Sequence, residues 1–265
     1  YKYGSYMEST VICCSTQSGC PVKCKFCGTG GFFKRNLTAD EIVEQVKTVL
    51  EEVGIGEKEA LSIKKFQLMF MSMGEPFLNY DNLEKAIERL AEIYPSAQLL
   101  VSTSAPASIK TRFHDFIDLS KKYDKIGIQF SVHESTDENR KKLIPTNTST
   151  LKEIAELGEL WAFETGRKPF YNYCVHLRNN TKDDATRLTE IFKPEVWETT
   201  LSVICEKDES VKNSIERQLE IISQFSREMV EKGASIRVFN PAGQDDIGGG
   251  CGQLWYFQKW LKEHK

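Results

Sequence analysis

The sequence predicts an α/β fold arranged as a partial, TIM-like (β/α)6 barrel, and three observations predict it. Strand-like runs alternate with amphipathic helical stretches along the chain, which is typical of a parallel sheet with right-handed crossovers. Polar residues directly follow the strand-like runs, as they do at the catalytic end of such barrels. At 265 residues the chain is short for eight strand–helix units and fits six, which leaves one flank open for a bulky substrate.

The first unit begins with a short strand, expected over residues 9–15, directly before a cysteine-rich loop. Residues 38–41 read Thr-Ala-Asp-Glu, a capping box in which the threonine and the glutamate each satisfy a free amide at the start of a helix. Apolar residues then recur at helical spacing from Ile42 to Val53. We therefore expect an amphipathic helix that ends near Gly54.

The later units repeat this order of strand and helix. The expected strands are 66–71, 98–101, 126–130, 169–175, 199–204 and 235–239. The expected helices are 79–93, 114–122, 151–164, 183–192 and a last one marked by apolar residues from Ile215 to Met229. No internal repeat, low-complexity tract or linker interrupts them, so we expect one domain over residues 1–265 that ends in a glycine-rich loop.

Composition excludes several classes of protein. Hydrophobic residues at 40% and charged residues at 28% describe a globular chain that can bury a sizeable core. No apolar run approaches the roughly 20 residues of a membrane span, and the start carries no signal peptide, so we expect a cytoplasmic protein with no membrane contact. The net charge of −3 argues against nucleic-acid binding by charge alone. A local basic rim is still expected, because four cations surround the cysteine loop: Lys23, Lys25, Lys34 and Arg35.

Five of the eight cysteines fall within fifteen residues: Cys13, Cys14, Cys20, Cys24 and Cys27. The other three are Cys174, Cys205 and Cys251. A chain of this size needs no disulfide staples, and the crowding is typical of metal or redox chemistry in a reducing cytosol. We expect all eight to be thiols.

Cys20, Cys24 and Cys27 follow a C-x3-C-x2-C spacing. A four-iron cluster normally takes four thiolates, so three on a tight loop leave one iron open to a substrate or cofactor. Structural zinc is the alternative, although zinc sites usually repeat C-x2-C pairs. A further alternative is a non-enzymatic metal-binding module in which Cys251 supplies a fourth ligand.

The residues that follow the strands suggest a cofactor site. Gly74, Glu75 and Pro76 form a turn after the second expected strand, where a carboxylate can accept hydrogen bonds from an amino group. Ser102 and Ser131 can donate hydroxyls to a ligand, although serines at strand ends often only cap helices.

Three further side chains are less informative. His133 and His176 are as consistent with structural histidines as with substrate contacts. Arg140 lies in a charged run that reads as a solvated surface by default, with phosphate pairing as the alternative.

Cys251 lies in the loop 245–254, whose glycines permit unusual backbone angles and close approach to a ligand. A buried structural cysteine would normally come from a regular apolar segment, so this thiol is placed to move or react. Cys13 lies seven residues before Cys20, and Cys14 is expected to face the other way.

The cysteine triad is the signature of the radical S-adenosylmethionine (SAM) enzymes, and the chain as a whole resembles one family of them, the RlmN/Cfr methyltransferases. The segments that carry this resemblance are 10–27, 35–45, 73–76, 100–104, 131–133, 140–145 and 245–254. They span nearly the whole chain, and the terminal Cys-Gly-Gln-Leu loop is more specific than the triad. The resemblance implies a radical-SAM core that methylates an adenine ring carbon, C2 or C8, of rRNA or tRNA.

The resemblance also implies roles for particular residues. Cys20, Cys24 and Cys27 would bind a [4Fe-4S] cluster, and the SAM contacts would be Gly74, Glu75, Ser102, Ser131, Val132 and His133. One SAM would methylate Cys251, and a radical formed from a second SAM would activate that methyl group for addition to the base. Cys13 would then remove a ring proton and resolve the adduct as a disulfide. An electron donor such as flavodoxin or ferredoxin is implied, and a monomer is expected.

The sequence departs from the family pattern in two places. Members carry a helical N-terminal domain that contacts RNA, and only a few residues precede the core here, so we expect a divergent member without that domain. The asparagine expected after the sixth strand is replaced by Cys205, and an Asn-Pro pair occurs one strand later, at Asn240. These departures keep a radical-SAM enzyme acting on a peptide or small molecule as the alternative.

Overall fold

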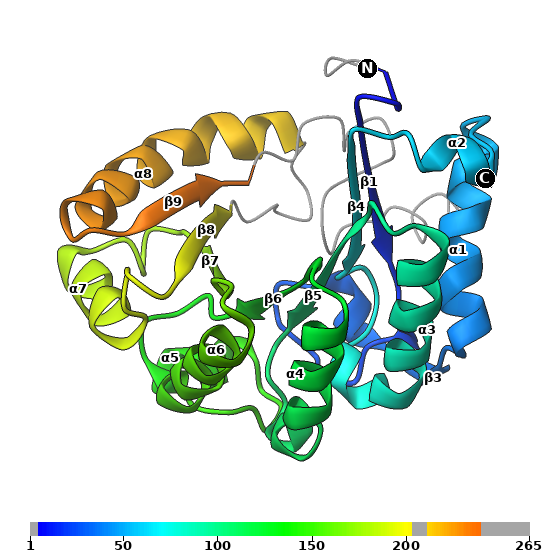
Figure 1. Ribbon diagram of the computed structural model, residues 1–265. Helices are drawn as coiled ribbons and strands as arrows, with labels where there is room; N and C mark the ends of the chain where they lie inside the picture. The colour runs from blue at the N-terminus through cyan, green and yellow to red at the C-terminus, as the bar shows by residue number, and fades with distance from the viewer. Residues whose placement is uncertain (1–4, 203–210, 240–265) are drawn as a thin grey trace, which may run out of the picture.

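The computed structural model describes residues 5–202 and 211–239 (Figure 1). Within them, seven parallel strands form one sheet in the order β1-β4-β5-β6-β7-β8-β9. The strands are β1 (Ser9–Cys14), β4 (Lys65–Phe70), β5 (Gln98–Thr103), β6 (Ile126–Ser131), β7 (Phe170–Cys174), β8 (Glu198–Ser202) and β9 (Ser235–Val238). A separate antiparallel pair, β2 (Gln17–Gly19) and β3 (Phe33–Asn36), flanks the cysteine loop.

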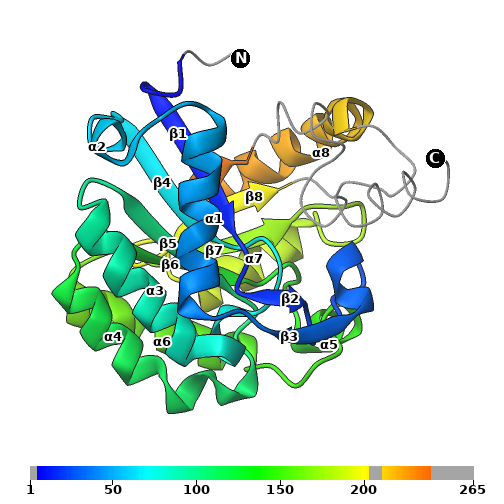
Figure 2. The same ribbon diagram turned by 90° about the vertical axis from the view of Figure 1, so that its right-hand side faces the viewer.

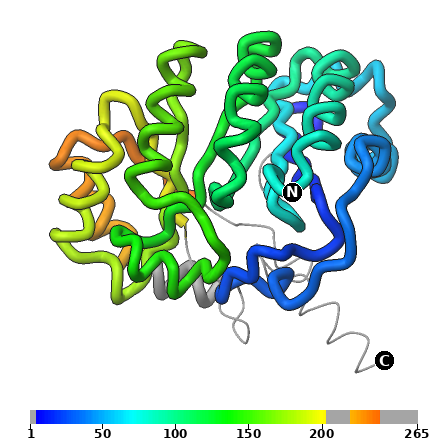
Figure 3. Tube along the Cα trace, turned by 90° about the horizontal axis from the view of Figure 1, so that it is seen from below, coloured from blue at the N-terminus to red at the C-terminus, as the bar shows by residue number. Residues whose placement is uncertain are grey.

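The sheet curves into a barrel that stays open, which confirms the predicted partial barrel. Each strand of this sheet pairs with the strand of the sheet that follows it in the chain, and β1 and β9 form the two edges. Seen from below, the elements follow an open arc from β1 to β9 (Figure 3). Sequential parallel pairing with a helical crossover at each step produces this curvature.

The long helices cover the outer face of the sheet, whereas the short α5 lies at the carboxyl ends of β5 and β6 (Figures 1 and 2). The helices are α1 (Ala39–Glu52), α2 (Glu57–Ala60), α3 (Tyr80–Ile93), α4 (Phe113–Lys122), α5 (Asp137–Leu143), α6 (Leu151–Thr165), α7 (Lys182–Ile191) and α8 (Val211–Glu231), with 3-10 turns η1 (Gly28–Gly31), η2 (Pro76–Asn79) and η3 (Ala107–Thr111). The predicted capping box is present, since Glu41 N donates to Thr38 Oγ1 and Thr38 N donates to the Glu41 carboxylate. In the described part of the chain, no helix has both the length and the apolar character needed to cross a membrane.

The two faces of the sheet differ in character. In β4, Leu68 and Phe70 are buried against the helices, whereas the alternate Met69 is only half-buried on the concave face. The concave face also carries polar pairs: Ser202 Oγ donates to Asn172 Oδ1 at 2.6 Å. Closed barrels fill this space with branched aliphatic side chains. The open barrel instead presents a hydrogen-bonding surface.

The charged run around Arg140 is not the solvated surface that the sequence suggested. It forms α5, capped by Thr136, whose Oγ1 accepts from Asn139 N. Lys141 and Lys142 are exposed, but Arg140 is only 2% exposed. The default interpretation was wrong for this residue, because one face of the short helix is packed against the ends of β5 and β6.

Candidate functional site

The candidate site lies where the parallel strands end, around the cysteine loop 20–27 between β2 and η1. Cys27 N donates to Cys24 O at 3.1 Å, and Gly30 N donates to Cys27 O at 3.2 Å, so the loop is wound on itself. Lys23 has a left-handed backbone with φ of 61°. A Cβ on Gly30 would lie 2.9 Å from Lys23 Cα, so a larger residue there would push the loop open.

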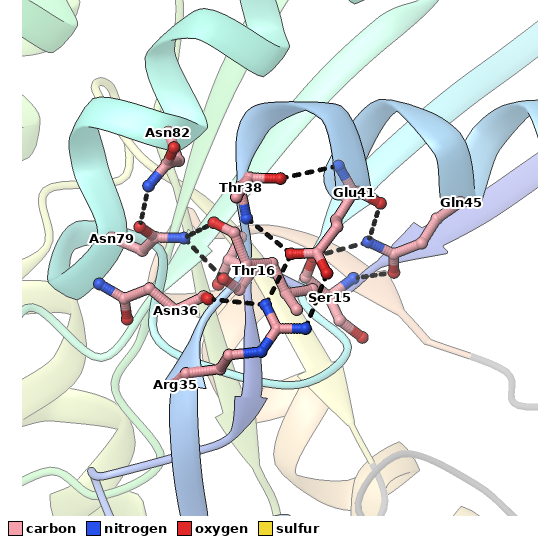
Figure 4. Close-up of polar contacts among 10 residues, drawn as sticks. Ser15, Thr16, Arg35, Asn36, Thr38, Glu41, Gln45, Asn79 and Asn82 are labelled. Atoms are coloured by element: carbon pink, nitrogen blue, oxygen red, sulfur yellow. Dashed lines mark hydrogen bonds and ion pairs between the residues drawn. The ribbon is translucent and has the colours of Figure 1, made fainter.

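The segment that leads from β1 into this loop is held by long-range hydrogen bonds (Figure 4). Ser15 N donates to Gln45 Oε1 at 2.8 Å, and Gln45 Nε2 donates back to Ser15 O at 3.0 Å. Asn79 Nδ2 donates to Thr16 O at 2.7 Å. The helices α1 and η2 therefore fix the approach to the cysteines.

The three loop cysteines lie near one another. The charges of Cys27 and Cys20 act on Cys24, and the charge of Cys27 acts on Cys20. Among the residues that the structure describes, no three metal-binding side chains are arranged around a single ion position. Three thiols on one loop offer ligands for three irons of a four-iron cluster, which binds each thiolate at a separate iron. The donor set fits such a cluster, and the choice of a cluster over structural zinc stays a prediction.

Without metal the thiols of Cys20 and Cys24 hold their protons at neutral pH, because the pKa of each is raised. Burial raises the pKa of Cys20 to about 11, against backbone hydrogen bonds from Val22 and Gly74 that lower it. Burial also raises the pKa of Cys24, and the neighbouring Cys27 and Cys20 add to the rise. Metal ligands bind as thiolates, so loading the loop must release protons.

The end of α5 and the residues that follow it support the cysteine loop, although they lie far from it in the sequence. Lys25 N donates to Leu143 O at 3.0 Å, and Thr146 Oγ1 donates to Val22 O at 2.5 Å. Phe26 packs edge-on against His133 with ring centroids 5.1 Å apart. Residues more than a hundred positions away thus hold both sides of the loop.

The predicted turn after β4 lies against the same loop. Gly74 has φ of 100°, and a Cβ there would lie 2.6 Å from Gln17 Cβ, so this position requires glycine. Glu75 N donates to Gln17 Oε1 at 2.8 Å, and Thr16 N donates to Met73 O at 2.8 Å. The turn is therefore joined to the segment that precedes Cys20.

The carboxylate of Glu75 is buried and already occupied. Oε1 accepts from Thr103 Oγ1 at 2.6 Å and from Phe77 N at 3.1 Å. Oε2 accepts from both the amide and the hydroxyl of Ser104, each at 2.7 Å. Burial raises the pKa of Glu75, while these hydrogen bonds lower it. Four donors fill the four lone-pair positions of a carboxylate, so a ligand amine would have to displace one of them.

The strand-end residues occupy the same edge of the sheet. Ser102 and Ser131 are half-buried, and Ser102 Oγ accepts from Gln129 Nε2 at 3.4 Å. Val132 is fully buried, so its side chain belongs to the core. The amides of Val132 and His133 both donate to Asn172 O, at 3.0 and 3.2 Å, which joins this turn to β7.

His133 is the most constrained of these residues. It is 4% exposed, adopts a left-handed backbone with φ of 62°, and its Nδ1 is buried without a partner among the described residues. Burial, reinforced by the charge of Arg140, lowers the pKa of His133 to about 3. The ring is therefore neutral, with one polar atom free beside the cysteine loop.

Cys13 and Cys14 leave β1 on opposite faces, as predicted. Cys14 is fully buried in the core, and burial raises its pKa to about 12. Cys13 is exposed on the concave face, although the surrounding sheet still shields its thiol from water enough to raise its pKa. The other predicted catalytic residue, Cys251, lies outside the described residues, as do Cys205 and Asn240.

One polar cluster at this edge was missed by the sequence reasoning. His176 Nε2 lies 3.0 Å from Glu134 Oε1, and His176 Nδ1 accepts from Arg178 N, so the hydrogen sits on Nε2. The fully buried Asn179 joins the two loops, because its Nδ2 donates to His133 O and Cys174 O. Both ring nitrogens of His176 have partners, which favours the structural interpretation. Nothing in local sequence pairs Glu134 with a residue 42 positions away.

The predicted basic rim is only partly free. Lys23, Lys25 and Lys34 are exposed and make no ion pair within residues 5–202 and 211–239. Arg35 instead binds Glu41 through two parallel bonds, each of 2.7 Å. Its guanidinium supports the capping box of α1 rather than facing solvent unpaired (Figure 4).

Comparison with known proteins identifies the class. The family model of the radical SAM superfamily matches residues 14–186. A solved radical SAM methyltransferase from Sphaerobacter thermophilus superimposes with a TM-score of 0.73 at 25% identity, covering 92% of this chain and 70% of the other. Streptococcus suis SuiB, at 13% identity and a TM-score of 0.58, shares the fold alone.

The curated relatives show which family within this superfamily the chain belongs to. A protein of Thermotoga petrophila, named "Probable dual-specificity RNA methyltransferase RlmN", is 32% identical over 95% of this chain and 72% of its own length. The chain thus belongs to the RlmN family of radical SAM proteins. A relative of the same name from Heliobacterium modesticaldum is 32% identical over 96% of this chain, which spans 65% of that relative's length.

Proposed function

We propose that the chain is a radical SAM methyltransferase that adds a methyl group to an adenine ring carbon, C2 or C8, of rRNA or tRNA. Its family membership supports the chemistry. The relatives named as RNA methyltransferases support RNA over a peptide or a small molecule as the substrate. The observation that carries the proposal is Cys13, an exposed thiol on the concave face of the strand that leads into the cysteine loop.

In this proposal Cys20, Cys24 and Cys27 would hold a [4Fe-4S] cluster. When bound, the cluster would supply the electron for reductive cleavage of SAM. The protein holds SAM across the strand ends: the turn at Gly74 offers backbone atoms, and Ser102 and Ser131 offer hydroxyls.

The other proposed residues act mainly through position. Glu75 keeps the turn in register with β5, because its carboxylate is bound to Thr103 and Ser104. Val132 and His133 present the end of β6, with His133 Nδ1 as a free acceptor or donor beside the loop. Two cysteines have chemical roles in the proposal. Cys251 carries the methyl group. Cys13, on the concave face, removes the ring proton from the covalent RNA adduct and resolves that adduct as a disulfide.

The RNA would approach the rim of the cysteine loop. Lys23, Lys25 and Lys34 are exposed there, so they offer positive charge to phosphates without first breaking an ion pair to a described residue. In the described residues β1 and β9 are the two edges of the sheet, and we place the approach of a nucleotide to the concave face between them.

The deciding experiment combines anaerobically reconstituted protein, SAM, a reductant and total RNA from cells that lack the gene. We expect release of 5′-deoxyadenosine together with adenosine methylated on C2 or C8, detected by nucleoside mass spectrometry. Cys13→Ala should abolish the methylated nucleoside, and Cys14→Ala is the matched control on the opposite face of the strand. Deoxyadenosine release without any methylated nucleoside would exclude RNA as the substrate. Absence of deoxyadenosine would exclude radical SAM chemistry.

A further inference from the structure

Arg140 makes an unusual set of contacts for a buried cation. Its Nη1 donates to Thr148 Oγ1 at 2.8 Å and to Ser149 O at 3.0 Å. Its Nη2 donates to Ser104 O at 2.7 Å and to Ser131 O at 3.0 Å. A guanidinium has five N–H donors, and the fifth, on Nε, is buried without a partner among the described residues.

All four acceptors of Arg140 are neutral. The ion pairs of arginine in the described residues involve other side chains, and none includes Arg140. Burial lowers the pKa of Arg140 to about 10, so the guanidinium keeps its charge at neutral pH. A buried charge costs free energy unless a nearby opposite charge offsets it.

The structure places three sources of negative charge near Arg140. Asp137 acts on it most strongly, but this carboxylate is exposed at the start of α5, where solvent screens its charge. Glu75 lies across Ser104, whose amide and hydroxyl bind the carboxylate while its carbonyl binds the guanidinium. The third source is the cysteine loop. Leu143, one helical turn after Arg140, accepts from Lys25 N directly beside Cys24, and the charges of Arg140 and Cys24 affect each other. The Glu75 carboxylate already has four donors, whereas the cysteine thiolates would gain a counter-charge from Arg140.

We propose that Arg140 is a positioning residue for the iron–sulfur cluster, which supports the cysteine loop through α5 and supplies the buried positive charge against which the cluster is reduced. The inference rests on the proposed cluster at Cys20, Cys24 and Cys27. Reduction takes one electron from an external low-potential donor and adds one negative charge to the cluster. A fixed cation stabilises the reduced form more than the oxidised form, so it raises the midpoint potential.

The first test compares Arg140→Gln and Arg140→Lys in anaerobically reconstituted protein. Midpoint potentials are measured by redox titration with electron paramagnetic resonance, and bound iron is measured per chain. We expect Arg140→Gln to lower the potential and the iron content. Arg140→Lys should lower stability, because it loses the planar fork, but should keep a potential near that of the wild type.

Arg167 provides a matched structural control. Its guanidinium also donates to backbone carbonyls, those of Ser120, Tyr123 and Asp124, and its Nε is also buried without a described partner. It lies at the opposite end of the sheet, where β6 begins. Arg167→Gln should therefore lower stability without changing the midpoint potential.

A second pair of variants keeps Arg140 and its carbonyl contacts in case Arg140→Gln does not fold. Thr148→Asp gives the guanidinium a carboxylate partner in place of the hydroxyl that it now binds. This change should lower the midpoint potential while the hydrogen bonds from Arg140 to the carbonyls stay in place. Thr148→Asn introduces a side chain of the same shape as aspartate but without its charge, so it should leave the midpoint potential unchanged.

The outcomes separate this inference from the proposed function. If the wild type takes up no iron, the cluster itself is wrong. If the wild type binds iron but Arg140→Gln and Thr148→Asp both keep its potential, the charge of Arg140 has no redox role. Equal shifts in Arg140→Lys and Arg140→Gln would likewise overturn the inference, since only the missing hydrogen bonds would then matter.

Discussion

Glu75 and Arg140 are buried on opposite sides of Ser104, which binds the carboxylate through its amide and hydroxyl and the guanidinium through its carbonyl. This single residue after β5 joins the turn that follows β4 to the helix that supports the cysteine loop. Disturbing either side chain should therefore affect both halves of the candidate site.

Glu75→Gln should destabilise the protein. The amide nitrogen of glutamine would face donors that now bind a carboxylate oxygen, and each buried donor left unpaired costs roughly 1–3 kcal/mol. Chemical denaturation of the metal-free protein measures the change in the free energy of unfolding. Glu138→Gln is the control, because Glu138 pairs with Lys142 at the exposed surface and should change little. If the two substitutions change the free energy of unfolding equally, the hydrogen bonds of Glu75 stabilise the fold no more than an exposed ion pair does.

His133 should make stability depend on pH. Its pKa is near 6.5 in the unfolded chain and is lowered by burial to about 3 in the fold. Between these values the unfolded chain binds more protons, so the free energy of unfolding falls as the pH falls, by about 1.4 kcal/mol per unit. At pH 5 the loss relative to pH 7 should be about 2 kcal/mol.

His133→Asn should remove this part of the pH dependence, since asparagine tolerates a left-handed backbone and does not titrate. Denaturation of the metal-free protein at pH 7 and pH 5 measures it. The exposed His114 is the control, and His114→Gln should leave the slope unchanged. A wild-type slope in His133→Asn would mean that the ring is protonated in the folded state.

The cysteine loop should bind iron in preference to zinc. Anaerobic reconstitution should give a brown, oxygen-sensitive protein, and Cys20→Ala, Cys24→Ala and Cys27→Ala should each lose the cluster. Cys174→Ala, outside the loop, serves as the control and should keep it. Tight zinc binding by the wild type with no iron uptake would contradict the cluster.

The two proposed catalytic cysteines should fail differently. Cys251→Ala should give neither methylcysteine nor an RNA adduct, because the methyl carrier is missing. Cys13→Ala should still methylate Cys251 but stall with RNA covalently attached, which is visible as a nuclease-sensitive band shift. Full turnover by Cys13→Ala, or the same outcome for both variants, would rule out a paired-cysteine mechanism.

RNA binding should depend on the unpaired lysines and not on Arg35. Removing one lysine that neutralises a phosphate should reduce the slope of log affinity against log salt by roughly 0.7–0.9. Lys23→Glu and Lys25→Glu should each flatten the slope by at least this amount. Arg35→Gln should leave the slope unchanged and instead weaken α1, since its guanidinium is bound to Glu41. If neither lysine variant changes the affinity for RNA, the RNA-binding surface does not include these lysines.

Local patterns in the sequence were sufficient for the architecture. Alternating burial along β1 placed Cys13 and Cys14 on opposite faces, because successive side chains of a strand point to opposite sides of a sheet. The capping box at Thr38 and Glu41 was equally readable, since both partners lie within one helical turn. The spacing of Cys20, Cys24 and Cys27 predicted a shared loop. Each of these features depends on residues that are neighbours in the chain.

Only the tertiary structure decided which polar groups are free. Arg140 reads as one more cation in a charged run, yet it is buried against carbonyls from two strand ends. Arg35 is paired with Glu41, and Glu75 is bound by four donors before any ligand arrives. Burial and hydrogen bonding depend on the contacts a side chain makes in space, and the support of the cysteine loop by residues 143–146 joins segments over a hundred positions apart. Sequence periodicity carries no information about such contacts. The candidate site residues could therefore be named from the sequence, but which of their polar atoms lack a hydrogen-bond partner could not.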